Sequence, residues 1–189
     1  MKKRLYALPM ILGSALLFAS CEKDNDNGGE GNEEEVITTM TLKFTPQGGG
    51  TAVEYDFDDP DGPGGTAATQ DEIVLTPNKT YDVEIVLLNK TTDPDEVITE
   101  EVEEEGQAHR FYVVPSAGSG ITVSNLNNDT GGMPLGITST WTTGAAATGT
   151  VKVTLRHYPG NPPNKAANDP VDSNKSSTDI EVNFASRVE

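Results

Sequence analysis

Alternating apolar and polar residues are the main structural signal in this chain. Between residues 36 and 45, Val36, Thr38, Met40, Leu42 and Phe44 share one parity, and mostly polar residues take the other. This period of two is typical of a strand with one buried face. Shorter runs of the same kind predict strands over 53–57, 73–75, 81–87, 111–114, 121–124, 137–142, 150–158 and 180–184. Gly, Pro and Asn separate these runs and no helices alternate with them. The pattern therefore predicts an all-β fold, an antiparallel β-sandwich of Ig-like or Greek-key type with about eight or nine strands.

One segment, near 94–105, has the pattern of a short helix instead. Asp93 is a good capping residue, Pro94 suits the first helical position and Glu96 suits the third. The later turns are rich in glutamate, at the end where the helix dipole already places negative charge. A solvated acidic face explains this composition, and a bound cation or basic partner is the alternative.

The first twenty residues have the composition of a signal peptide. Lys2, Lys3 and Arg4 precede an apolar run that ends at Phe18, and Ala19-Ser20 then lead to the only cysteine, Cys21. Residues 17–21 (LFASC) resemble a lipobox. The resemblance predicts Cys21 as the lipidation site, with acyl chains that anchor the protein to a membrane without a spanning helix. An ordinary secretory signal with an incidental cysteine is the alternative.

An acidic tether and one domain are predicted after the signal. Residues 22–35 contain no apolar side chain, so we expect residues 21–35 to form a flexible tether and residues 36–189 to form a single β-sandwich domain. Lys23-Asp24 followed by more acid resembles the export signal of Bacteroidota-type surface lipoproteins. The predicted location is the outer membrane with the domain exposed at the cell surface, and the periplasmic leaflet is the alternative.

Charge and cysteine content exclude several function classes. Three of the 13 Lys and Arg leave with the signal, so 10 basic residues face 30 acidic ones in the mature chain. Nucleic acid is therefore not an expected partner, since binding phosphates needs a basic face. With Cys21 acylated, a cysteine nucleophile, a disulfide and a thiolate metal site are also excluded.

Six segments spread over the chain carry a family resemblance. They are EEEVITT at 33–39, DPDGPGG at 59–65, LTPNKTY at 75–81, DEVITEEVEEE at 95–105, GMPLGIT at 132–138 and VTLRH at 153–157. Together they resemble a family of small Bacteroidota outer-membrane lipoproteins that is often labelled type 1 periplasmic binding fold superfamily. The resemblance implies no established activity. The fold label itself disagrees with this sequence, because that fold needs repeated βαβ units in a chain about twice as long.

Histidines and carboxylates are the residues that could bind a metal. His157 follows the inward parity of its strand, and His109 begins the strand after the acidic helix. Glu104, Glu105 and His109 are close enough in sequence to share a site for zinc or another divalent ion. A strand-end histidine that is hydrogen-bonded to a neighbour is the alternative for His157.

The loop after residue 55 offers hard oxygen ligands for calcium. Its candidate ligands are Asp56, Asp58, Asp59 and Asp61. The spacing does not fit an EF-hand, and a turn stabilised by Asp and Gly is the alternative. A second polar tract, 159–176, predicts a long loop that is disordered or faces a ligand.

The sequence contains no recognisable catalytic motif, so we predict no enzyme. The predicted function is a non-catalytic outer-membrane or cell-surface lipoprotein, an accessory module that captures a ligand or a divalent cation, calcium or zinc. Its expected partners are the membrane, through Cys21, and a TonB-dependent outer-membrane transporter. A structural or adhesive surface module without a small ligand is one alternative, and a periplasmic-binding-type solute-binding lipoprotein is another.

Overall fold

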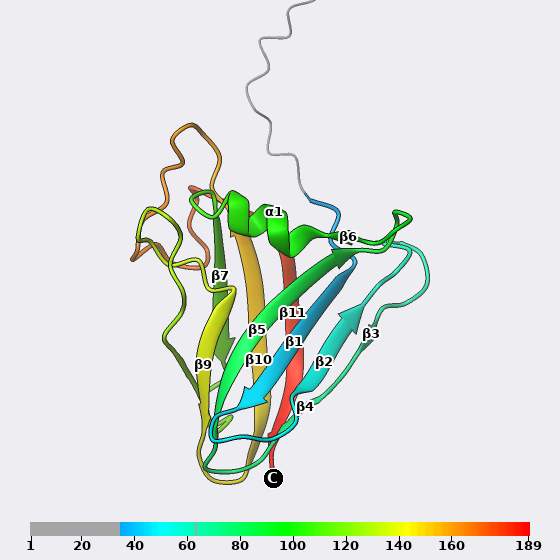
Figure 1. Cartoon of the computed structure of the whole chain (residues 1–189), viewed down its shortest axis with the longest axis vertical. Coiled ribbons are helices and arrows are strands. Elements are labelled where there is room, and N and C mark those ends of the chain that lie inside the picture. Colours follow the sequence, from blue (N-terminus) through cyan, green and yellow to red (C-terminus); the bar gives the residue numbers. More distant parts are fainter. Residues whose placement is uncertain (1–34, 63) are drawn as a thin grey trace, which may run out of the picture.

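The structure, a computed structural model, describes residues 35–62 and 64–189. The predictions for the signal peptide, for Cys21 and for the tether as far as residue 34 lie outside the described residues. The described chain forms eleven strands and one short helix (Figure 1). In chain order they are β1 (Thr39–Pro46), β2 (Val53–Asp58), β3 (Thr69–Gln70), β4 (Ile73–Leu75), β5 (Thr80–Asn89), β6 (Glu96–Val97), α1 (Ile98–Glu104), β7 (His109–Pro115), β8 (Ile121–Ser124), β9 (Thr138–Thr143), β10 (Ala147–His157) and β11 (Ser177–Val188).

The strands form two sheets that face each other. The larger sheet has the order β3-β2-β1-β5-β9-β8, with β6 paired to β5, and the smaller sheet has the order β4-β11-β10-β7. This arrangement confirms the predicted all-β sandwich. One pair departs from the prediction of a wholly antiparallel fold, because β4 pairs in parallel with the end of β11. The chain reaches β4 from the edge of the larger sheet, so it joins the smaller sheet as an edge strand in the direction of β11.

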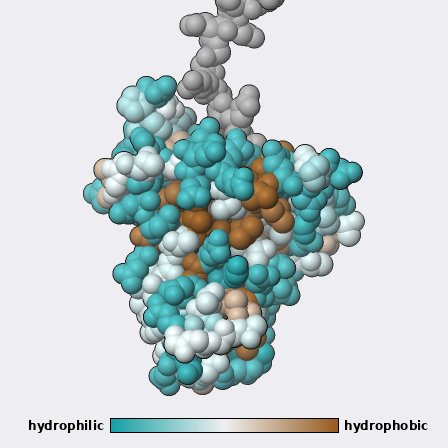
Figure 2. All heavy atoms as spheres, in the orientation of Figure 1, coloured by the Kyte–Doolittle hydropathy of each residue, from teal (hydrophilic) through white to brown (hydrophobic). Residues whose placement is uncertain are grey.

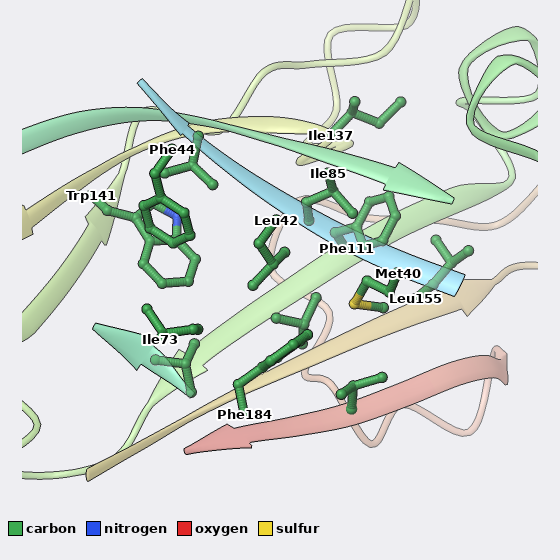
Figure 3. Packing of buried hydrophobic residues seen from close by; sticks show 14 of the residues in the cluster. Met40, Leu42, Phe44, Ile73, Ile85, Phe111, Ile137, Trp141, Leu155 and Phe184 are labelled. Carbon is green, nitrogen blue, oxygen red and sulfur yellow. The ribbon is translucent and has the colours of Figure 1, made fainter. Parts of the chain in front are cut away.

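The core lies between the sheets and follows the predicted alternation. Met40, Leu42 and Phe44 of β1 are fully buried, whereas Val36, at the same parity but before the strand, is 51% exposed. Phe44 packs edge-on against Trp141, with ring centroids 5.0 Å apart. Figure 3 shows these side chains meeting Phe184 and others from the smaller sheet. Interlocked apolar side chains of this kind fix the register of both sheets, because a shift by one residue would turn each buried set outwards.

The single helix is confirmed, but its predicted start is wrong. Helix α1 begins at Ile98, four residues after Pro94, and Val97 is its N-cap. The intervening residues Glu96 and Val97 pair with the end of β5 as strand β6, so they cannot join a helix. Ile98 and Val102, one turn apart, bury one face of the helix and leave its glutamates outside.

One end of the sandwich carries most of the irregular structure. Helix α1, the start of β1 and the loop that follows β10 all lie at this end, and the C-terminus lies at the other (Figure 1). The face seen in Figure 2 is mainly hydrophilic with an apolar patch across it. No helix in the described part of the chain is long and apolar enough to cross a membrane.

Candidate metal-binding site

Four side chains with metal-ligating atoms meet at the end of the sandwich that carries α1. Glu35, His109, His157 and Asp179 each offer one ligand atom, and these atoms lie within 4.8 Å of one another. Among residues 35–62 and 64–189 this is the only such group of three or more His, Cys, Asp or Glu residues. The group could hold a metal ion.

Strand pairing explains why the two histidines are neighbours. His109 is the first residue of β7 and His157 the last of β10, and the antiparallel register places them directly opposite each other. Directly opposed side chains have Cβ atoms roughly 4.5–5.5 Å apart. The two imidazole rings accordingly lie with centroids 4.8 Å apart and planes inclined by 41°.

A β-bulge brings Asp179 to the same place. Strand β11 pairs with β10 at Leu155↔Ile180 and next at Arg156↔Thr178, so Asp179 is the extra residue of a β-bulge. An extra residue interrupts the in–out alternation and re-aims a side chain. Asp179 thus joins a row of ligands on three adjacent strands, β11, β10 and β7.

Glu35 comes from the segment that leads into β1, in the other sheet. Its carboxylate lies 2.9 Å from Nε2 of His109, and the two side chains are 7% and 0% exposed. Glu35 belongs to the stretch predicted as a flexible tether, yet its side chain is held against the sandwich. A divalent ion bound by all four residues would therefore connect the two sheets.

The other ring nitrogen of His109 fixes the orientation of the imidazole. Nδ1 lies 3.2 Å from the backbone oxygen of Glu105, which can accept a hydrogen bond from it. This contact directs Nε2 towards Glu35 and the centre of the group. Metal-binding histidines are commonly oriented in this way, with the second ring nitrogen donating to a carbonyl or carboxylate.

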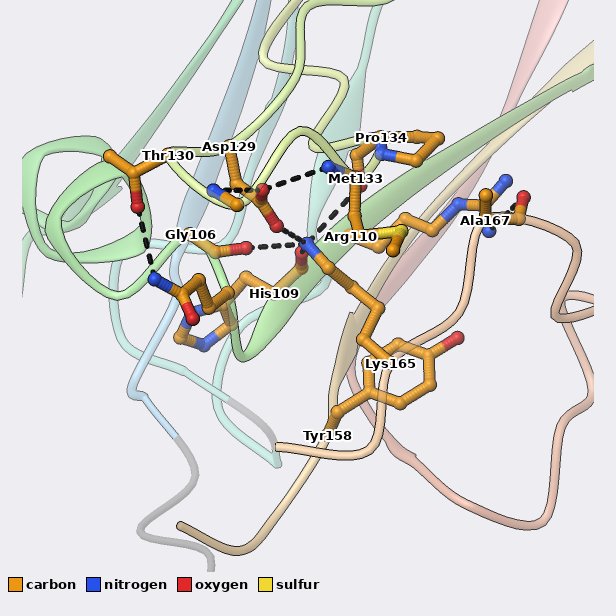
Figure 4. Close-up of polar contacts among 12 residues, drawn as sticks. Gly106, His109, Arg110, Asp129, Thr130, Met133, Pro134, Tyr158, Lys165 and Ala167 are labelled. Carbon is orange, nitrogen blue, oxygen red and sulfur yellow. Dashed lines mark hydrogen bonds and ion pairs between the residues drawn. The ribbon is translucent and has the colours of Figure 1, made fainter. Parts of the chain in front are cut away.

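A buried lysine fixes the backbone of the same histidine. Lys165 Nζ donates to the carbonyl oxygens of His109 at 2.8 Å and Gly106 at 2.5 Å, and it pairs with Asp129 at 2.5 Å (Figure 4). The side chains of Lys165 and Asp129 are 3% and 1% exposed. Lys165 belongs to the 159–176 tract, so this tract, predicted as disordered or ligand-facing, is fastened to the sandwich beside the candidate site.

The pKa values of the two histidines in the group are shifted in opposite directions. Burial alone would raise the pKa of Glu35 and lower that of His109, but their mutual hydrogen bond and charge interaction outweigh burial and shift both pKa values the other way, down for Glu35 and up for His109. Burial and the neighbouring His109 both lower the pKa of His157. In the absence of a metal, these pKa shifts favour the protonated form of His109 beside Glu35 and the neutral form of His157, the form that binds metals.

Two buried polar atoms in the group lack a hydrogen-bond partner among the described residues. They are Oε2 of Glu35 and Nδ1 of His157. Buried side-chain nitrogen and oxygen atoms are rarely left in this state, and an ion or water is a common explanation where they are. Both atoms are potential metal ligands, so an ion bound here would satisfy them.

The structure keeps only part of the set of ligands suggested by the sequence. His109 and His157 are brought together, whereas Glu104 and Glu105 are exposed and lie outside the group. Glu105 contributes through its backbone oxygen only. The carboxylates of Glu104 and Glu105 point away because α1 turns its apolar face to the core and its acidic face to solvent.

The four aspartates proposed for calcium do not form such a group. Asp58 accepts hydrogen bonds from Lys90 and Thr39, both at 2.7 Å, and Asp61 accepts one from the backbone N–H of Thr66 at 2.8 Å. Asp56 and Asp59 are not joined to them in a metal-ligating cluster. The loop therefore resembles the alternative reading, a turn stabilised by its own aspartates.

Sequence reasoning missed Glu35 and Asp179. Glu35 is one of several glutamates before β1, and nothing local distinguishes it. Asp179 stands beside Ile180 at the start of an alternating run, where it has the parity of a solvent-facing residue. Only the β-bulge, which depends on pairing with β10, turns it into the group.

Comparison with known proteins adds no assignment. No protein-family model, no curated protein and no solved structure matches this chain. The family resemblance of the sequence therefore stays a prediction.

The ion pair in this group predicts a pH-dependent stability for the metal-free protein. The contribution of His109 is complete below the ordinary pKa of 6.5 and is lost as the pH rises through its higher folded-state value. The contribution of Glu35 is complete above its ordinary pKa of 4.5 and is lost as the pH falls through its lower folded-state pKa. We therefore expect Glu35→Gln to reduce the free energy of unfolding most between pH 4.5 and 6.5, and less on either side.

Urea unfolding of the full chain in chelator, at pH values from 3 to 9, measures this profile as the difference between wild type and variant. The exposed Glu104→Gln is the matched control and should show no maximum. A constant difference between wild type and Glu35→Gln across the series would contradict the ion pair.

Proposed function

We propose that this chain is a lipid-anchored, non-catalytic module of the outer membrane that captures a divalent cation at Glu35, His109, His157 and Asp179. The observation that carries the proposal is the convergence of these four side chains within 4.8 Å. Calcium and zinc are the two ions that the sequence left open. The anchor at Cys21, exposure at the cell surface and work beside an outer-membrane transporter are the remaining parts of the proposal.

The alternatives are less well supported by the arrangement of residues. A structural or adhesive module without a ligand gives no reason for a buried histidine, a half-buried histidine and two carboxylates to converge. A solute-binding lipoprotein of the periplasmic-binding type needs two α/β lobes with a cleft between them. The described residues form two packed β-sheets instead.

Ion binding is the direct test of the captured ligand. The full chain should bind about one divalent ion in titration calorimetry, and His157→Ala should abolish this binding because it removes one of two nitrogen ligands. The chain has only two histidines, so the imidazole NMR signals of the wild type should report the binding directly. Glu105→Gln, which retains the backbone oxygen that orients His109, is the control and should bind as the wild type does. Absence of binding by the wild type would refute the cation-capture function.

The anchor is tested separately. Cys21→Ala removes the thiol that would be acylated, so we expect the variant to leave the membrane fraction and become soluble after cell fractionation. Cys21 is the only cysteine in the chain, which makes the result simple to interpret. A variant that stays in washed membranes would overturn the lipid anchor. External protease on intact cells should remove the wild-type domain if it faces outwards and leave it if it faces the periplasm.

A further inference from the structure

The four candidate ligands differ in how firmly the fold positions them. His109, His157 and Asp179 lie on β7, β10 and β11, three neighbouring strands of the smaller sheet. The ladder between β7 and β10 pairs His109 with His157, and the paired residues Thr178 and Ile180 flank Asp179 on β11. Glu35 instead precedes β1, outside any ladder.

The attachment of Glu35 to the rest of the fold is correspondingly slight. Thr38 is hydrogen-bonded to the larger sheet. Its N–H donates to the backbone oxygen of Leu88 at 2.9 Å, and its hydroxyl accepts from the N–H of Lys90 at 2.8 Å. Three residues upstream, the carboxylate of Glu35 reaches His109. Val36, between these two attachments, is 51% exposed. Glu35 and Val36 therefore lie outside the hydrogen bonds that hold the chain to the larger sheet from Thr38 onwards.

The donor set itself distinguishes between ions. Calcium binds about six to eight oxygen ligands, so imidazole nitrogens suit it poorly. Zinc accepts nitrogen and carboxylate oxygen together, usually in a tetrahedron with bonds of about 2.0–2.2 Å. Two imidazoles and two carboxylates supply four ligands, and the two carboxylates match the charge of a divalent ion. Tetrahedral bonds of this length separate the ligands by roughly 3.3 Å, so a group that already lies within 4.8 Å needs only a small contraction.

We propose that the site binds zinc through three fixed ligands and one exchangeable ligand; this inference rests on the proposed cation capture. His109, His157 and Asp179 form a rigid base on the smaller sheet. Glu35, from the segment that leads into the larger sheet, is the exchangeable fourth ligand. With Glu35 in place the ion has four protein ligands and no open position, which suits retention of the ion and not catalysis. Without Glu35 the ion keeps three protein ligands and opens one position to water or to an added anion.

The test compares the full chain with two conservative variants, Glu35→Gln and Asp179→Asn. The probes are Zn²⁺ and Ca²⁺ for affinity, and Co²⁺ with added azide for the coordination sphere, because the absorption of Co²⁺ depends on its geometry. Wild type should bind Zn²⁺ and not Ca²⁺, and its Co²⁺ spectrum should be tetrahedral and unchanged by azide. Glu35→Gln should lose at least about 10-fold in Zn²⁺ affinity, since the loss of a partner outside the ligand shell already costs roughly that much, and it should gain a response to azide. Asp179→Asn should lose more affinity than Glu35→Gln, because it removes a ligand of the rigid base. Glu104→Gln is the matched control.

The outcomes separate this inference from the function on which it rests. No binding of any ion by wild type would refute cation capture itself. Binding of Ca²⁺ as tightly as Zn²⁺ would refute the choice of ion. Equal affinity and equal azide response in wild type and Glu35→Gln would refute the exchangeable ligand while leaving capture intact. Circular dichroism and urea unfolding of each metal-free variant show whether a loss of affinity is merely a loss of fold.

Discussion

Replacing Lys165 by methionine is expected to lower the free energy of unfolding by about 3–5 kcal/mol, the usual cost of removing one partner from a buried ion pair. The ammonium of Lys165 is almost completely enclosed and lies 2.5 Å from the carboxylate of Asp129. It also donates to the backbone oxygens of Gly106, His109 and Pro134. Methionine has a similar volume but donates no hydrogen bond, so it would leave the carboxylate and the three carbonyls without their shared donor.

Burial shifts the pKa values of Lys165 and Asp129 in opposite directions, and this determines what the loss of the lysine does to Asp129. Burial lowers the pKa of Lys165, and its pairing with Asp129 only partly offsets the effect. For Asp129 burial acts in the opposite direction, but the hydrogen bond of Lys165 and the backbone N–H groups of Met133 and Gly131 outweigh it and lower its pKa. Removing Lys165 takes away the largest cause that lowers the pKa of Asp129 and leaves the two backbone N–H groups against burial. Asp129 then either keeps an unpaired buried charge or takes up a proton, and both outcomes cost stability.

Urea unfolding of the full chain measures the loss, which corresponds to a melting temperature lower by roughly 6–20 °C. Lys79→Met, at an exposed lysine, is the matched control and should change stability by less than about 0.5 kcal/mol. Adding Asp129→Asn to Lys165→Met should recover part of the loss, since it removes the stranded carboxylate. A Lys165→Met variant as stable as the control would show that the pair contributes little.

The architecture could be predicted from the sequence because each strand carries its own signal. The buried apolar positions of β1 and β10 alternate along each strand, and the burial of Met40, Leu42 and Phe44 confirms the parity assigned to them. Helix α1 was harder to place because its start depends on tertiary pairing. Asp93 and Pro94 are good helix-start residues locally, but Glu96 and Val97 bind to β5 instead. Local propensity is here overridden by a neighbouring strand.

The candidate site shows where this kind of reasoning ends. His109 and His157 were recognisable as candidates because histidine is rare in the chain and both stand at strand ends. Their partners depend on long-range pairing, since Glu35 and His109 are 74 residues apart. Glu104 and Glu105 are near His109 in sequence, but the helix turns them to solvent. Proximity in sequence therefore pointed to the wrong carboxylates for this group. The register between β10 and β11 brings Asp179 into it instead.

Zinc is expected to stabilise the folded chain more than calcium or sodium does at equal ionic strength. Outside the signal and tether, 23 acidic residues face 9 basic ones, which gives a formal charge of −14. Any salt screens such self-repulsion, because screening depends on ionic strength and not on coordination. A specific site adds a second effect that saturates. Zinc at one hundred times its dissociation constant should add about 2.7 kcal/mol to the free energy of unfolding, or roughly 5–11 °C in melting temperature.

Four variants assign the second effect to particular residues. His157→Ala and Asp179→Asn remove ligands of the group, so both should lose the zinc-specific shift and keep the shift common to all salts. Asp59→Asn and Glu104→Gln alter carboxylates that lie outside the group and should retain the full zinc response. Melting curves of the full chain at several zinc concentrations and constant ionic strength measure both effects. Equal shifts for zinc, calcium and sodium, unchanged in all four variants, would leave screening as the only effect of cations and would favour a structural module over a cation-capturing one.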